Sequence, residues 1–120
     1  MGASKVAKLM NQTKNLLICS DLETADSFWK RMKGLLGRSE MKETEGLWIK
    51  SCSSIHTYFM KFPIDVAFVD KNLKVTKISQ SVTPGRLLFS TIGSRHVFEF
   101  GSGRLNNNNL EVGDQLNVDH

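Results

Sequence analysis

The residues of this chain that could perform chemistry gather between positions 46 and 70. This segment holds half of the ten aromatic residues, together with Cys52, His56 and Asp65. Cys52 and His56 are four residues apart, so they could act as a nucleophile and its base, or as two ligands of a metal ion with Asp65 as the third. A zinc site needs three or four ligands, and a reactive thiolate needs a lowered pKa and an oriented histidine. An enzyme that uses these three residues is therefore an alternative interpretation, and we expect no metal and no other cofactor.

A binding pocket is the leading interpretation of the same segment. Asp65 shares a predicted strand face with Ala67 and Val69, and a carboxylate covered there must find a donor, because an unpaired buried charge is costly. Arg95 and His56 are the candidate donors. In the functional interpretation Asp65 anchors a pocket for a small molecule or an extended peptide, built from residues 54–65. In the structural interpretation it forms a buried ion pair or a backbone hydrogen bond that fixes the loop. The predicted ligand-binding residues are His56, Tyr58, Phe59, Met60, Asp65 and Arg95.

Other chemical signatures fail on their spacing. Residues 101–103 read Gly-Ser-Gly and lack the third glycine of a dinucleotide-binding loop. Residues 34–39 imitate the end of a phosphate-binding loop, but the spacing is too short and Arg38 stands where lysine is required. These departures exclude the common nucleotide-binding motifs.

The charge of the chain is concentrated in one part of the sequence. Sixteen Lys and Arg stand against twelve Asp and Glu, a net charge of +4. Between residues 71 and 104 there are six cations and one acidic residue, Glu99. The cations are spaced rather than clustered, so a solvated basic face is the plain interpretation and nucleic acid is not the favoured partner. An accessory protein that binds an acidic partner or nucleic acid through residues 71–104 is the second alternative.

The sequence carries no membrane or export signal that we can identify. No uncharged stretch approaches the roughly 18 residues of a membrane span, and residues 1–6 lack the features of a signal peptide or a myristoylation site. Two cysteines 33 residues apart are a weak disulfide pattern. We expect a cytoplasmic monomer with reduced cysteines.

The length of 120 residues predicts a single domain over residues 1–120, with residues 1–4 as a disordered N-terminus. Apolar residues recur at helical spacing up to Leu36 and Thr24 can cap them, which predicts one α-helix near residues 24–36. Pro84 and Gly85 suit the central positions of a type II turn. Short β-branched and aromatic runs predict a hairpin in the first twenty residues and strands at 47–49, 64–69, 73–78, 87–89, 95–100 and 115–118. The expected fold is mainly β, a compact β-sandwich or barrel of about seven short strands with that one helix, and Ile64, Val66 and Phe68 facing the core.

Four blocks of the sequence also carry a resemblance to a known family. The most specific block includes Ser54-Ile55-His56-Thr57-Tyr58-Phe59-Met60-Lys61-Phe62-Pro63-Ile64-Asp65, and the others are residues 30–38, 95–103 and 110–116. In this order the blocks resemble the prokaryotic family catalogued as domain of unknown function 192, and the resemblance covers residues 25–118. It implies a compact β-rich fold and brings no established activity, substrate or catalytic residue. The chain departs from the family pattern in residues 100–103, where Phe-Gly-Ser-Gly replaces Leu-Pro-Ala-Gly, and in lacking the export signal of many relatives.

Overall fold

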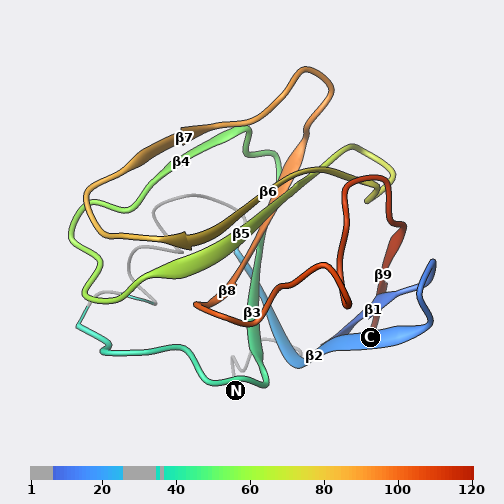
Figure 1. The fold of residues 1–120 in the computed structure, drawn as a ribbon, viewed down its shortest axis with the longest axis horizontal. Helices are drawn as coiled ribbons and strands as arrows, with labels where there is room; N and C mark the ends of the chain where they lie inside the picture. The colour runs from blue at the N-terminus through green and yellow to red at the C-terminus, as the bar shows by residue number, and fades with distance from the viewer. Residues whose placement is uncertain (1–6, 26–34, 36) are drawn as a thin grey trace.

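Nine β-strands build the part of the chain that the computed structural model describes, namely residues 7–25, 35 and 37–120 (Figure 1). They are β1 (Ala7–Asn11), β2 (Leu16–Ala25), β3 (Glu45–Ile49), β4 (Ser54–His56), β5 (Ile64–Val69), β6 (Val75–Val82), β7 (Leu87–Phe89), β8 (His96–Gly101) and β9 (Leu116–Asp119). Seven strands form one mixed sheet in the order β6-β5-β8-β3-β2-β1-β9, and β4 pairs with β7 in a separate sheet. The predicted mainly β fold and its opening hairpin are confirmed, with nine strands instead of about seven.

The large sheet curls until its two edges meet at one end. β6 and β9 are the outermost strands in the sheet order, yet the Val75 amide donates to the Asp114 carbonyl (2.9 Å) and the Leu116 amide donates to the Leu73 carbonyl (3.0 Å). An isolated bridge joins Lys74 and Gln115 between these two bonds. The sheet is therefore a half-barrel, closed at the start of β6. Beyond that point β5 is the only strand that pairs with β6 among the described residues.

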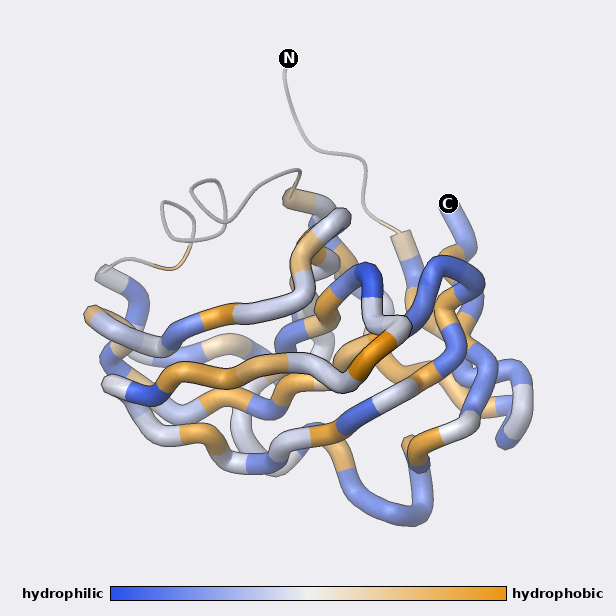
Figure 2. The backbone as a smooth tube through the Cα atoms, turned by 90° about the horizontal axis from the view of Figure 1, so that it is seen from above, coloured by the Kyte–Doolittle hydropathy of each residue, from blue (hydrophilic) through white to orange (hydrophobic). Residues whose placement is uncertain are grey.

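A hydrophobic core lies on each face of this sheet. Ala67 and Val69 of β5 belong to a core inside the half-barrel, whereas Ile64, Val66 and Phe68 belong to a second core on the opposite face. All six residues of β5 are buried, and Figure 2 shows hydrophobic stretches along the strands and hydrophilic residues in many of the loops. The bulky side of β5 faces a core as predicted, but the Asp65 side faces one as well.

The predicted helix does not begin at Thr24. Thr24 and Ala25 are the last residues of β2, where they pair in parallel with Trp48 and Ile49 of β3. The capping preference of a threonine is a weak local signal, and pairing with a largely buried strand outweighs it. Apart from Leu35, the remaining positions of the predicted helix, 26–34 and 36, lie outside the described residues.

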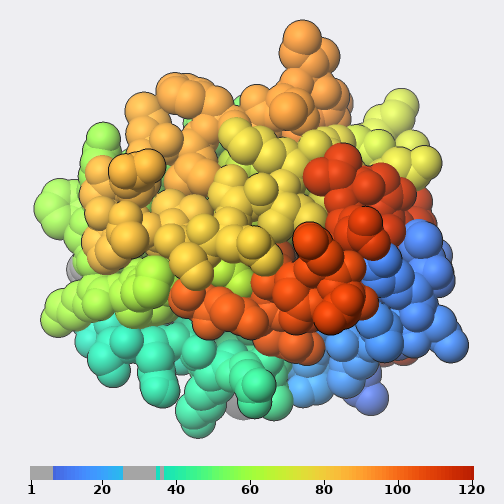
Figure 3. Space-filling view, viewed as in Figure 1, coloured from blue at the N-terminus to red at the C-terminus, as the bar shows by residue number. Residues whose placement is uncertain are grey.

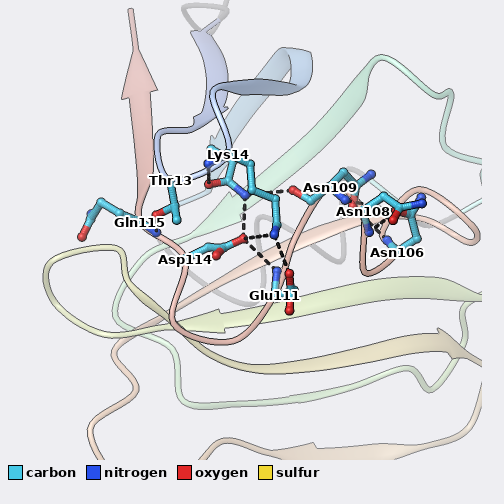
Figure 4. A network of polar contacts seen from close by, with 9 residues as sticks. Thr13, Lys14, Asn106, Asn108, Asn109, Glu111, Asp114 and Gln115 are labelled. Atoms are coloured by element: carbon cyan, nitrogen blue, oxygen red, sulfur yellow. Dashed lines mark hydrogen bonds and ion pairs between the residues drawn. The ribbon is translucent and has the colours of Figure 1, made fainter.

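Buried polar groups fix the loop that precedes β9 (Figure 4). The side-chain amide of Asn11, which is fully buried, donates to Oδ2 of Asp114 and to the carbonyl of Asn109, both at 2.8 Å. The same Asp114 oxygen accepts the amide of Glu111 (2.9 Å), whose carboxylate is paired with Lys14. The end of β1 thus holds a loop that is distant from it in sequence.

Gly46 allows the close approach of three strands. A Cβ atom at this position of β3 would lie 2.7 Å from Sγ of Cys19 and 3.0 Å from Cε1 of Phe100.

We expect Gly46→Ala to lower the free energy of unfolding by about 1–3 kcal/mol because the added methyl group overpacks the core, as measured by urea denaturation. Adding Cys19→Ala removes the nearer obstacle, so the double variant should lose less stability than the sum of the two single changes. Additive losses would contradict this explanation.

Candidate functional site

Thr57 ties the segment 54–60 to the turn at 83–86. Thr57 is fully buried, its amide donates to the Arg86 carbonyl (2.8 Å), and its carbonyl accepts the Gly85 amide (3.0 Å). Its hydroxyl donates to the Thr83 carbonyl and accepts the Arg86 amide, both at 2.8 Å. Gly85 has a φ of +84°, which fits its predicted place in a type II turn. Thr57 is not among the predicted site residues, and the structure shows that it continues the pairing of β4 with β7 into the turn at 83–86.

The predicted binding residues on this segment point in two directions. The His56 ring stacks on Tyr58 with 4.7 Å between centroids, and its Nδ1 accepts the Tyr58 amide (3.2 Å). Phe59 is 76% exposed and has a φ of +69°, a conformation that phenylalanine rarely adopts. Met60, by contrast, is buried in the second core. His56, Tyr58 and Phe59 are therefore accessible, and Met60 is a packing residue.

Asp65 is sealed between backbone amides. It is fully buried, Oδ1 accepts the Ser81 amide (2.7 Å), and Oδ2 accepts the Leu105 amide (2.8 Å). This is the backbone hydrogen bonding that the structural interpretation of Asp65 anticipated. Because side chains alternate along a strand, Asp65 points to the face opposite Ile64 and Val66, and Met60 packs on the face of those two residues. Asp65 and the segment 54–60 therefore lie on opposite faces of the sheet.

Arg95 lies at the far end of β5 from Asp65. Asp65 pairs with Phe100 and Val69 pairs with His96, so four residues, or about 13 Å of strand, separate Asp65 from the level of Arg95. The Arg95 side chain is exposed, and its backbone bonds to Val69 and Cys52. The structure does not bring Asp65 and Arg95 together, and the six residues stay a prediction as a binding set.

The two cysteine thiols lie in different surroundings. Burial raises the pKa of the Cys19 thiol to about 11, and half-buried Cys52 donates its thiol to the Ser54 carbonyl (2.9 Å). Within the described part of the chain, no three His, Cys, Asp or Glu side chains lie close enough together to hold a metal ion.

A groove runs between β6 and β7 (Figure 3), and it encloses about 690 Å³. One wall is formed by Lys77, Ser79 and residues 80–83, and the other by residues 86–89. Lys77 crosses the groove, and its Nζ donates to the Phe89 carbonyl (2.7 Å). Lys77 and Arg86 are the only charged residues in this lining, all of which is described, so the groove is positively charged. Both cations belong to the basic segment 71–104, which is the sequence signal that pointed toward this site.

Comparison with known proteins identifies uncharacterised relatives. Residues 9–118 match the family model DUF192, described as an uncharacterized ACR. The chain is 31% identical over 111 residues to a UPF0127 protein of Pyrococcus horikoshii, an alignment that covers 90% of this chain and 96% of that protein. A UPF0127 protein of Thermococcus sibiricus is 29% identical over 112 residues, covering 90% and 72%. A crystal structure of a protein of unknown function from Novosphingobium aromaticivorans has the same fold, with a TM-score of 0.77 at 18% identity over 95% of this chain and 84% of that one. No helix in the described ranges is long and apolar enough to span a membrane.

Replacing the Asp65 carboxylate tests its structural role. In Asp65→Asn the side-chain NH₂ group faces one of the two amide donors, so a buried donor loses its acceptor. We expect a loss of about 2–3 kcal/mol in the free energy of unfolding, measured by urea denaturation. Asp119→Asn, at an exposed position of β9, is the control and should change little. A stable Asp65→Asn variant would contradict the role assigned to this carboxylate.

His96 should make stability depend on pH. Burial, and then the neighbouring cations Arg95 and Lys50, lowers the pKa of His96, and its Nδ1 accepts the Ser51 amide (2.9 Å). The unfolded chain therefore binds more protons than the folded one as the pH falls below the ordinary value of about 6.5, and stability falls in that window until the lower folded-state pKa is passed. His96→Gln should flatten this part of the profile in urea unfolding between about pH 7.5 and 5. An unchanged slope would refute the assignment.

Proposed function

The chain belongs to the DUF192 (UPF0127) family, and on that premise we propose that it is a binding module that holds an extended ligand in the groove between β6 and β7. The groove itself is the observation that carries the proposal, because it is a hollow of about 690 Å³ with a strand on each side. Ligand binding alone, without catalysis, accounts for the residues that line the groove.

The chemistry of the lining favours a peptide over a compact small molecule. Pockets for small molecules are mostly apolar and enclose their ligand. Here the β6 wall carries the polar side chains of Lys77, Ser79 and Gln80, and the β7 wall adds the apolar Leu87 and Phe89, which are 54% and 63% exposed. An extended polypeptide can meet both walls at once, with polar groups on one side and an apolar side chain on the other.

The predicted segment 54–65 takes part in this site indirectly. His56 pairs with Leu87, and Thr57 holds Arg86, so the segment positions the β7 wall. Cys52 and His56 are absent from the lining, and the groove therefore offers neither a thiol nor an imidazole for catalysis. This geometry favours a binding module over the enzyme alternative.

A selection from a phage-displayed random-peptide library tests the proposal. We expect peptides that bind the wild-type protein and shift the NMR amide signals of β6 and β7. Arg86→Glu should weaken these peptides by about tenfold or more, the effect of losing about 1.4 kcal/mol, in isothermal titration calorimetry. Lys71→Glu is a matched control, because Lys71 is an exposed cation outside the groove lining.

The selection has two outcomes that would refute a groove-binding function. One is a library that yields no binding peptide. The other is a set of peptides whose signals map away from β6 and β7 and whose affinity is insensitive to Arg86→Glu.

A further inference from the structure

We infer that the ligand is a segment of another polypeptide that adds as a strand to the open edge of β6, with acidic side chains in the groove and apolar side chains on the opposite face. The inference rests on the proposed function of the groove and adds the chemistry and orientation of the ligand.

The backbone of β6 presents hydrogen-bonding groups at this edge. The Phe68 carbonyl faces β6, since it accepts the Thr76 hydroxyl (3.1 Å), and the Val69 carbonyl faces the other way, since it accepts the Arg95 amide (2.7 Å). Lys77 pairs with Phe68, so its backbone groups point into the sheet. Because these directions alternate along an antiparallel strand, the N–H and C=O of Ile78 point out of the sheet. A guest strand beside residues 76–80 would meet both groups.

Two hollows flank the same edge, one on each face of β6. The groove lies on the side of Lys77 and Ser79, and a second hollow of about 340 Å³ lies on the side of Ile78. Gln80 lines both hollows. Figure 3 shows the chain that follows β8 next to β6 on this second side. Side chains of an added strand would enter the two hollows in alternation, which is how strand addition combines backbone bonding with side-chain selectivity.

The two hollows differ in charge. The groove has Lys77 and Arg86 and no carboxylate, which favours acidic side chains. The second hollow is lined by three apolar residues, Ile78, Leu110 and Val112, of which Val112 is 63% exposed, and by three polar ones, Gln80, Asn107 and Glu111. The one charge in its lining, Glu111, is paired with Lys14. Apolar side chains suit this face. The matching ligand therefore alternates acidic and apolar residues.

Charge also disfavours a second copy of β6 as the occupant. Residues 75–82 read Val-Thr-Lys-Ile-Ser-Gln-Ser-Val and contain no acidic side chain. Two copies paired through this strand would bring cations into one groove, and lysine on an edge strand discourages such pairing. The occupant is a different, acidic chain.

Synthetic peptides test the inference. The probe is a capped nine-residue peptide in which glutamate and valine alternate, and it should bind with an affinity measurable by calorimetry. A peptide with lysine for glutamate, and a peptide of the same composition with the glutamates grouped in one block, should each bind about tenfold more weakly, a difference of about 1.4 kcal/mol. Equal binding of all three peptides would overturn the inference.

Backbone methylation separates strand addition from side-chain binding. In one methylated peptide the N-methyl groups lie on alternate residues, and in the other they lie on the intervening residues. Only one set of amides faces β6, so one peptide should lose about tenfold in affinity while the other keeps most of it. If both methylated peptides bind like the parent, no strand is added to β6.

Charge reversal on the protein provides the reciprocal test. The Lys77→Glu/Arg86→Glu variant should prefer the lysine peptide, and Lys71→Glu should keep the preference for the glutamate peptide. An unchanged preference in the double variant would place the acidic side chains elsewhere.

Sedimentation measurements test whether a second copy of the chain occupies the edge. If the protein forms concentration-dependent dimers and Ile78→Pro abolishes them, a second copy occupies the edge and the inference is overturned.

The two proposals fail in different ways. If library peptides bind the groove but methylation and alternation have no effect, strand addition is wrong and the groove remains a binding site. If neither the library nor the designed peptides bind, both proposals are wrong.

Discussion

The carboxylate of Asp65 fixes the backbone at Ser81, where β6 bends beside the groove. It joins β5 to two other segments through the amides of Ser81 and Leu105. β6 contains an extra residue at Ser81, which has a φ of +48°. Ile64 pairs with Val82 and Val66 pairs with Ser79, so β6 has two residues between these pairs where β5 has one. A bulge of this kind bends its strand, and here it leads the chain into the turn at 83–86 and back along β7. The same carboxylate anchors the start of the loop that forms the second hollow. Both sides of the β6 edge therefore depend on one buried charge with two amide donors.

Local patterns predicted most strands of this fold, but they missed the short β4 (Ser54–His56) and the connections between strands. The β-branched and aromatic residues identified the strand at 64–69, and Pro84 with Gly85 identified the turn, because each signal resides in adjacent residues. The parallel pairing of β2 with β3 joins residues about 24 positions apart, and it extends β2 through Thr24, where the local signal indicated a helix cap. The contact of Asn11 with Asp114 spans 103 residues. Such pairings depend on tertiary packing between distant segments, so no local pattern in a single sequence specifies them.

The candidate site, too, was predicted from the sequence only in part. The residue type correctly indicated that a buried Asp65 carboxylate needs hydrogen-bond donors. It could not identify those donors, because they are backbone amides, which do not depend on residue type. Proximity in sequence suggested that His56 and Asp65 share a pocket, whereas strand alternation and the position of β4 place them on opposite faces of the sheet. Lys77 and Arg86 stood out only as members of a basic segment. Their placement in the lining of one groove results from the bulge and the turn between them.

The closure of the half-barrel has a consequence for how the protein folds. β1 pairs with β2 on one side and with β9 on the other, and β9 also supplies residues that meet the start of β6. These late contacts join segments that are far apart in sequence, a topology that slows folding and leaves strand edges exposed in intermediates. During synthesis, the free edge of β1 can be covered only after residues 116–119 have left the ribosome. The nascent chain therefore passes through a stage in which several strand edges are open, and in the part of the chain that the structure describes β6 keeps such an unpaired edge.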